Sequence, residues 1–441
     1  MPESDLQAII GEERMVSGAA AEAAFDGGDF FALRDMLDTG ADGLSETDRL
    51  FYSAACANAF GRTEESEGLI TEFLSRFGDS AADDYVFEIL KIRADNILRG
   101  FRYGEAARLY AGLLDERFAG IADEKEREEI ANSVALWSPL EGVPPQRLET
   151  KGGAIIPCRT TSFRHISVEV EAGGVSAGFL FDTGANLSAI TESQAARMGM
   201  RELETDVKVI TSTGAAIRSR LAVADRLSVG GMVFSNVIFL LLRDEELVFE
   251  ELDYRIEGVV GIPVIRQMRE VWIGNGYIEI PGEPSPPPGR QNLCFEGMMP
   301  VVEALSGSER LVFTLDTGAN RTELSHRYWT RNRERIESEG IKVVSKRAGG
   351  GGVVDVEGYE LPGFPLSIGG REAALRRIGV SLEPYIFNEH KDGNLGLDVL
   401  RALGGVRISF EGMFVAPVPE RSETSPQFLS YVKMDSGELF A

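Results

Sequence analysis

The sequence is poor in cysteine, with three such residues in 441. Cys56, Cys158 and Cys294 show no metal-ligand spacing and no disulfide framework of the kind that small secreted domains use. Such usage fits a reducing compartment or inert buried thiols. A bond between Cys158 and Cys294 stays open as an alternative, because each precedes one of two repeated segments by a similar distance.

Histidine is equally scarce. His165, His326 and His390 lie in no common motif, so neither a Ser-His-Asp arrangement nor a zinc site can be assembled from their neighbours. We therefore treat the three histidines as structural and expect no metal and no organic cofactor.

Long apolar runs are also missing, since no stretch approaches the roughly 18 residues that a membrane-spanning helix needs. Residues 1–5 have no basic region followed by an apolar run, so they do not resemble a secretion signal. We expect no membrane insertion and a cytoplasmic location. A periplasmic or secreted location is the alternative if the N-terminus of the sequence was trimmed.

Basic residues are outnumbered, and the formal net charge is −25. Residues 1–150 hold 31 acidic and 14 basic side chains, whereas residues 151–441 hold 39 and 31. An acidic surface repels nucleic acid and anionic lipid, so neither is an expected partner. The plainer interpretation of this charge is solubility.

The first part of the chain has helical character. From about residue 5 to residue 135, apolar positions recur every three to four residues and β-branched runs are few. We predict an all-helical domain over residues 1–145. The segment 103–110 resembles the second helix of a tetratricopeptide repeat, which implies helical hairpins and a docking surface for a protein partner. A packed helical cap is the alternative.

The sequence changes character after the turn-rich residues 139–145, and short strand-like segments separated by glycine-rich turns follow. Residues 281–290 are rich in proline, cannot pair in a sheet and suggest a stiff linker. The fold class is therefore α+β multidomain: all-α first, then mainly antiparallel β. The predicted divisions are a first β lobe (155–282), a linker (283–290), a second β lobe (291–418) and a C-terminal tail (419–441).

The β part repeats itself. Residues 181–186, Phe-Asp-Thr-Gly-Ala-Asn, recur 134 residues later as Leu-Asp-Thr-Gly-Ala-Asn at 315–320. A second block, Gly-Val-Val-Gly-Ile-Pro-Val-Ile at 258–265, recurs 135 residues later as Gly-Asn-Leu-Gly-Leu-Asp-Val-Leu at 393–400. Two blocks at nearly one offset indicate that the same fold unit occurs twice.

The repeated tripeptide points to acid–base chemistry by a carboxyl pair. Two carboxyls about 3 Å apart cannot both ionise, so one serves as a base that activates water while the other serves as an acid. That chemistry needs one aspartate from each unit, and Asp182 and Asp316 are the candidates.

Each aspartate is followed by a small hydroxyl residue, which can lock the loop, and by a glycine, which allows close backbone approach. These supporting residues are Thr183, Gly184, Thr317 and Gly318. An apolar strand precedes each aspartate, and a helix is expected to start at Thr191 and at Ser325, where a hydroxyl can cap it.

Both blocks together resemble the pepsin-like and retropepsin-like aspartic proteases, in which hydrophobic-hydrophobic-Asp-Thr-Gly lies beneath a later hydrophobic-hydrophobic-Gly element. The resemblance covers about residues 160–418. It implies a bilobal acid-protease fold like a fused retropepsin dimer, and an aspartic endopeptidase that cleaves a peptide or protein substrate as a monomer with water held between Asp182 and Asp316. Asn394 departs from the pattern, because an apolar residue is usual there, and it suggests different packing in the second lobe.

By the same resemblance, a β-hairpin flap should cover each side of the cleft. The candidates are the segments 211–214 and 347–352, and the flap residues they offer are Thr211, Thr213, Gly214, Gly349 and Gly350. Ordinary turns are the alternative for both segments.

Two other interpretations stay open. A third Asp-Thr-Gly, at Asp38, follows a segment with helical spacing, so we interpret Gly40 as a helix C-terminal cap and exclude this copy from the site. The protein as a whole could instead be a non-enzymatic peptide-binding or adaptor protein with an inactive protease fold. It could also be an enzyme whose cleft the helical domain or the tail occludes.

Overall fold

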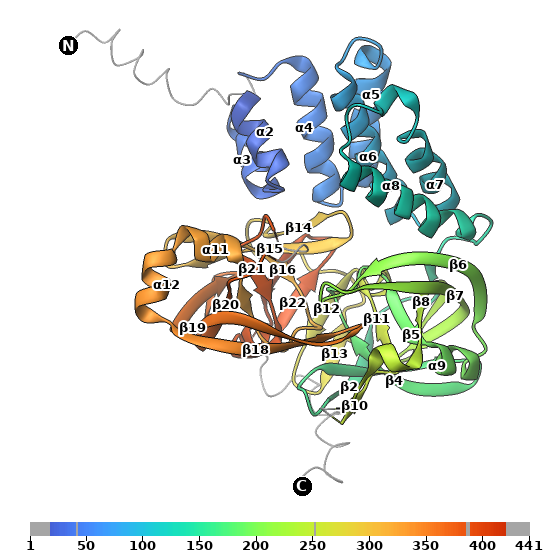
Figure 1. Ribbon diagram of the computed structural model, residues 1–441, viewed down its shortest axis with the longest axis vertical. Helices are drawn as coiled ribbons and strands as arrows, with labels where there is room; N and C mark the ends of the chain where they lie inside the picture. The colour runs from blue at the N-terminus through green and yellow to red at the C-terminus, as the bar shows by residue number, and fades with distance from the viewer. Residues whose placement is uncertain (1–17, 41–42, 251–252, 385–388, 420–441) are drawn as a thin grey trace.

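The computed structural model describes residues 18–40, 43–250, 253–384 and 389–419. A group of helices lies along one side of two β-rich units (Figure 1). This order, helical and then β, confirms the α+β class. Most of the predicted C-terminal tail, from residue 420 onward, lies outside the described residues.

The helical prediction is confirmed for the described residues up to 137. The helices are α2 (Gly18–Asp26), α3 (Phe30–Gly40), α4 (Glu46–Ala59), α5 (Thr63–Phe77), α6 (Asp83–Arg99), α7 (Tyr103–Gly112) and α8 (Glu124–Trp137), with 3₁₀ turns η2 (Glu116–Phe118) and η3 (Ser138–Leu140). Ser45 and Asp123 cap α4 and α8 by accepting backbone N–H groups, as such residues do at helix starts. Asp38 and Gly40 lie within α3, which ends at Gly40, so the third Asp-Thr-Gly closes a helix; Gly40 was predicted as the cap and is instead the last helical residue.

The first unit spans residues 154–280 and belongs to a 13-stranded sheet. Its strands are β2 (Ala154–Thr160), β3 (Ile166–Ala172), β4 (Val175–Phe181), β5 (Ser188–Thr191), β6 (Arg201–Ile210), β7 (Ala216–Val229), β8 (Met232–Leu242), β11 (Gly258–Val260), β12 (Glu270–Ile273) and β13 (Tyr277–Ile280). The smaller elements around them are β1 (Arg147–Leu148), β9 (Val248–Phe249), β10 (Tyr254–Arg255), α9 (Glu192–Arg197), η4 (Asp244–Leu247) and α10 (Ile262–Gln267).

The second unit spans residues 293–417 and forms an 8-stranded sheet. Its elements are β14 (Leu293–Glu296), β15 (Met299–Ser306), β16 (Glu309–Leu315), β17 (Glu323–Leu324), α11 (His326–Arg331), α12 (Arg333–Glu339), β18 (Ile341–Gly349), β19 (Gly352–Ile368), β20 (Arg371–Ser381), β21 (Gly393–Leu395) and α13 (Leu397–Ala402). Its last hairpin, β22 (Val406–Ser409) and β23 (Phe414–Pro417), joins the first sheet instead.

The two units share one strand order around the repeated blocks. In the first, β11 lies parallel to β4 and antiparallel to β5, and β5 lies parallel to β8. In the second, β21 lies parallel to β16 and antiparallel to β17, and β17 lies parallel to β20. The duplication seen in the sequence is therefore also a duplication of strand pairing.

One sheet crosses from unit to unit. Strand β12 pairs antiparallel with β22 over four residues, with Glu270 opposite Ser409 and Ile273 opposite Val406. Between the units, residues 281–290 form no helix and no strand, as predicted. The loop is anchored where the Ser285 N–H and hydroxyl donate to the buried Glu270 carboxylate at 2.8 and 2.9 Å.

Predicted helix caps differ between the copies. Ser325 caps α11 by accepting the N–H of Tyr328 at 3.3 Å. Thr191 stands at the equivalent start of α9, but its side chain makes no capping bond, so the capping prediction is wrong there. All three cysteines are free thiols, and Cys158 and Cys294 are not joined.

Buried cations fix the helical part to the second unit. The Lys391 side chain is 2% exposed, and its ammonium contacts Glu296 Oε2 at 2.8 Å and donates to the Gly28 carbonyl at 3.2 Å. From the helical side, Arg99 donates to the Gly297 carbonyl at 3.0 Å. Because a buried charge is costly without partners, these contacts specify how the two parts dock.

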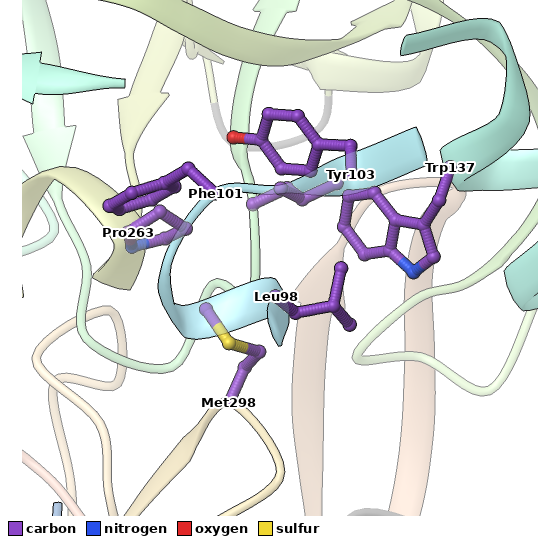
Figure 2. Close-up of a pocket in the computed structure, with 7 residues that line it drawn as sticks. Leu98, Phe101, Tyr103, Trp137, Pro263 and Met298 are labelled. Carbon is purple, nitrogen blue, oxygen red and sulfur yellow. The ribbon is translucent and has the colours of Figure 1, made fainter. Parts of the chain in front are cut away.

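An apolar hollow lies where the helical part meets the β units (Figure 2). The rings of Tyr103 and Trp137 stack at 5.4 Å between centroids. The side chains that line the hollow are Leu98, Phe101, Tyr103, Trp137, Leu187, Pro263 and Met298. None of them carries a charge, so this hollow serves packing between the parts.

No described helix is long and apolar enough to cross a membrane.

Replacing Lys391 with alanine should lower the free energy of unfolding by about 2–3 kcal/mol, because the variant leaves the Gly28 carbonyl and the Glu296 carboxylate without their buried partner. Urea unfolding measures the change. Lys125→Ala is the control, since that side chain is 73% exposed and its ion pair is long at 3.9 Å, so the change should stay within about 0.5 kcal/mol. Equal effects of the two substitutions would contradict the docking role of Lys391.

Candidate active site

The structure brings Asp182 and Asp316 together from the two units. Each follows an apolar strand, β4 or β16, and each backbone N–H donates at 3.0 Å to a carbonyl of the later repeated block, Val260 for Asp182 and Leu395 for Asp316. The second block thus holds the loop that carries the aspartate. The two carboxyls lie in hydrogen-bonding contact with each other.

The glycine of each tripeptide permits this approach. The Gly184 N–H donates to Asp182 Oδ1 and the Gly318 N–H to Asp316 Oδ1, both at 2.8 Å. A Cβ atom at Gly184 would lie 2.6 Å from Asp316 Oδ1, and one at Gly318 would overlap the Asp182 carboxyl. Any larger residue would therefore push the two carboxyls apart.

The threonines cross-link the two loops. Each backbone N–H of Thr183 and Thr317 donates to the hydroxyl of the other threonine at 3.0 Å. Each hydroxyl in turn donates at 2.7 Å to a strand-end carbonyl of the opposite unit, Leu315 for Thr183 and Phe181 for Thr317. Both threonines are fully buried, so no water competes for these four bonds.

Burial raises the pKa of the Asp182 carboxyl well above its ordinary value of 3.8, and the neighbouring Asp316 charge raises it further. The N–H groups of Gly184 and Gly318 act in the opposite direction because they stabilise the ionised form, but the raising causes are larger. Burial and the neighbouring charge therefore favour the protonated form of the Asp182 carboxyl. A carboxyl pair that keeps one proton can act as acid and base together.

Asn394 contacts the pair and His165 lies within electrostatic range of it, and the sequence did not assign either to the site. Asn394 donates from Nδ2 to Asp316 Oδ2 at 2.9 Å, so the departure from the apolar pattern is a direct contact with the carboxyl and not only a change of packing. His165 lies close enough for the Asp316 charge to raise its pKa, although burial has the larger effect and lowers it. Its Nδ1 lies 3.4 Å from the Tyr254 hydroxyl. No sequence motif marked His165, because the contact depends on how the loop 161–165 folds.

The predicted flap residues lie at the tips of two hairpins. Thr211, Thr213 and Gly214 form the turn between β6 and β7, where Gly214 has a φ of +80° that favours glycine. Gly349 and Gly350 lie at the turn between β18 and β19. The two tips meet, because the Thr213 hydroxyl donates to the Gly350 carbonyl at 3.3 Å. Their contact adds to the β12–β22 pairing and to the threonine cross-links between the units.

Among the described residues, no three His, Cys, Asp or Glu side chains are grouped so that they could hold a metal ion.

Residues 167–264 match a family model described as aspartyl protease. The matched segment runs from β3 into α10 and includes Asp182 and Gly261, and the second unit lies outside it. No curated protein matches the chain. The aspartyl protease match supports a protease, hence a hydrolase.

Thr317→Val should lower the free energy of unfolding by about 2–4 kcal/mol, because it leaves the Thr183 N–H and the Phe181 carbonyl buried without a partner while keeping the volume similar. Urea unfolding measures this loss. Thr317→Ser is the matched control, since it keeps the hydroxyl and should lose less. If valine and serine destabilise equally, packing rather than the cross-links holds the loops together.

Asp182→Asn should stabilise the protein relative to the wild type by an amount that grows as the pH rises from 4 to 8. The folded wild type binds the Asp182 proton more tightly than the unfolded chain, whose carboxyl has a pKa near 3.8, so its stability declines as the pH rises above that value. Urea unfolding at several pH values measures the difference. Asp225→Asn, at a side chain 78% exposed, controls for the loss of one negative charge. Stability curves of wild type and Asp182→Asn that stay parallel across this range would contradict the raised pKa.

Proposed function

We propose that the protein is an aspartic endopeptidase that hydrolyses peptide bonds with a water molecule activated between Asp182 and Asp316. The observation that carries the proposal is the pair itself: two carboxyls in hydrogen-bonding contact, each held by its own Asp-Thr-Gly loop, with the loops cross-linked through Thr183 and Thr317. A pair of this kind has one proton to share, which is the requirement for combined acid and base catalysis.

The reaction uses no group besides the carboxyls and water. The ionised carboxylate takes a proton from the water as its oxygen attacks the scissile carbonyl carbon, and the protonated carboxyl gives its proton to the carbonyl oxygen. The resulting tetrahedral diol is neutral. Its carbon–nitrogen bond then breaks as a hydroxyl proton returns to one carboxylate and the other carboxyl protonates the leaving amine, which restores the starting pair.

The architecture that fits this function is a fused pair of retropepsin-like lobes in one chain. The shared strand order of the two units and the symmetric bonds of Thr183 and Thr317 support it. Because both aspartates come from a single polypeptide, the monomer suffices for catalysis. No second subunit is needed to complete the site.

The substrate class is an extended peptide or an unstructured protein segment. The hairpin tips at Thr213 and Gly350 meet each other, and they would have to separate for a chain to enter. Their backbone groups can then bind the substrate by strand-like hydrogen bonds. In this role the tips are flaps, and the helical part, which has a tetratricopeptide-like segment at 103–110, is the surface for a protein partner.

The test is cleavage of an unstructured protein mixture across pH 3 to 8, with products identified by mass spectrometry. The wild type should cut, whereas Asp182→Asn and Asp316→Asn should each lose at least about a thousandfold in rate, because neither carboxyl alone supplies both acid and base. Thr317→Ser, which keeps the cross-linking hydroxyl, is the folded control and should retain activity.

Identical product patterns from the wild type and both aspartate variants would overturn the proposal. In that case the lobes would be a peptide-binding or adaptor module, and binding of the same mixture without cleavage would identify it.

A further inference from the structure

The two units differ in chemistry directly beside their aspartates. In the first unit, Leu180 and Val259 are neighbours across the parallel pairing of β4 and β11. In the second, the same two positions hold Thr314 and Asn394, neighbours across β16 and β21. The first unit thus has an apolar pair, and the second unit a polar pair, at equivalent positions of the repeated strands.

The polar pair contacts the Asp316 carboxyl. Asn394 Nδ2 donates to Asp316 Oδ2 at 2.9 Å. Thr314 is 3% exposed, and its hydroxyl donates to Asn394 Oδ1. With its Oδ1 accepting from the threonine hydroxyl, the Asn394 amide turns its NH₂ toward the carboxyl. Thr314, Asn394 and Asp316 therefore form a directed chain of hydrogen bonds.

The donors around the two carboxyls are unequal. Asp316 accepts from the N–H groups of Gly318 and Ala319 at Oδ1 and from Asn394 at Oδ2. Asp182 accepts from Gly184 at Oδ1 and is also stabilised by the Gly318 N–H, but it has Val259 where the amide would stand. Donors stabilise a carboxylate and disfavour the protonated acid. The first unit has no counterpart of the bond from Asn394.

We propose that Asn394 is a positioning residue that keeps Asp316 as the ionised member of the pair and leaves the shared proton on Asp182. The inference deepens the proposed function and rests on it for its role in turnover. In catalysis, Asp316 then accepts the proton of the attacking water, and Asp182 gives its proton to the substrate carbonyl oxygen.

Other charged groups face the pair and stay in place when only Asn394 changes. His165 lies within electrostatic range of Asp316, and Arg401 acts on His165 in turn. Glu323 is the strand neighbour of Asn394, and its carboxylate pairs with Arg347 at 2.6 Å. Because none of these contacts involves the Asn394 amide, a change in the titration of the pair on replacing Asn394 reports the lost amide donor.

The decisive variant is Asn394→Val, which places the first-unit residue at the second-unit position. The lower of the two pKa values of the carboxyl pair should rise by about one pH unit or more, because the ionised form loses a donor that stabilises it. The titration is measured by ¹³C NMR of aspartate carboxyls in the full-length protein, with signals assigned from Asp182→Asn and Asp316→Asn. This readout needs no turnover. If the protein cleaves peptide, the acid limb of its rate profile should move up by the same amount.

Two companion variants separate positioning from packing. Thr314→Val removes the hydroxyl that orients the amide and should shift the lower pKa in the same direction by a smaller amount. It decides the question if Asn394→Val does not fold. Val259→Ala alters packing at the equivalent first-unit position without removing a donor, and it should leave the lower pKa within about 0.3 pH units of the wild type.

An unchanged lower pKa in a folded Asn394→Val protein, or an equal shift in Val259→Ala, would overturn the inference. If Asn394→Val does not fold, an unchanged lower pKa in a folded Thr314→Val protein would overturn the inference instead. A wild type that titrates as expected but cleaves nothing would refute the proposed function and leave the role of Asn394 standing. A wild type that cleaves, together with folded variants that show no pKa shift, would support the proposed function and refute the role of Asn394.

Discussion

The architecture of the site depends on four buried hydrogen bonds between Thr183 and Thr317 and the opposing strand ends. Every one of them crosses between the units, so neither aspartate loop is complete without the other. In a buried setting each donor or acceptor left alone is costly, and the loops therefore hold together as one element. The antiparallel pairing of β12 with β22 also connects the two units, through a continuous sheet.

The cross-linked loops hold the carboxyls of Asp182 and Asp316 close together, although two negative charges at this distance would repel each other. Burial and the Asp316 charge raise the pKa of Asp182, so the folded protein gives up stability at neutral pH to keep the carboxyls together. The N–H groups of Gly184 and Gly318 offset part of this cost, and the same glycines leave room for the opposite carboxyl. Functional sites often carry a local loss of stability that the surrounding fold compensates.

The two units share one strand arrangement, but the residues beside their aspartates differ. Val259 and Asn394 occupy the same position in the repeat, yet only Asn394 reaches a carboxyl with a hydrogen-bond donor.

The helical part is also placed asymmetrically. It meets the second unit through the buried Lys391, while on the first unit the Asn132 amide pairs with the N–H and carbonyl of Lys208 on strand β6, which leads to one hairpin tip. The helical part thus contacts the strand behind that tip.

The sequence by itself determined much of this. Helical periodicity predicted the helices up to residue 137, the repeated blocks predicted two units with one strand order, and the doubled tripeptide singled out Asp182 and Asp316. Local patterns suffice for these features because propensity, turn chemistry and repetition are properties of neighbouring residues. Only the tertiary structure decided that Asn394 donates to Asp316, that His165 lies near the pair and that Thr191 makes no cap. Such contacts depend on distances between segments far apart in the chain and on side-chain orientation, which no local pattern encodes.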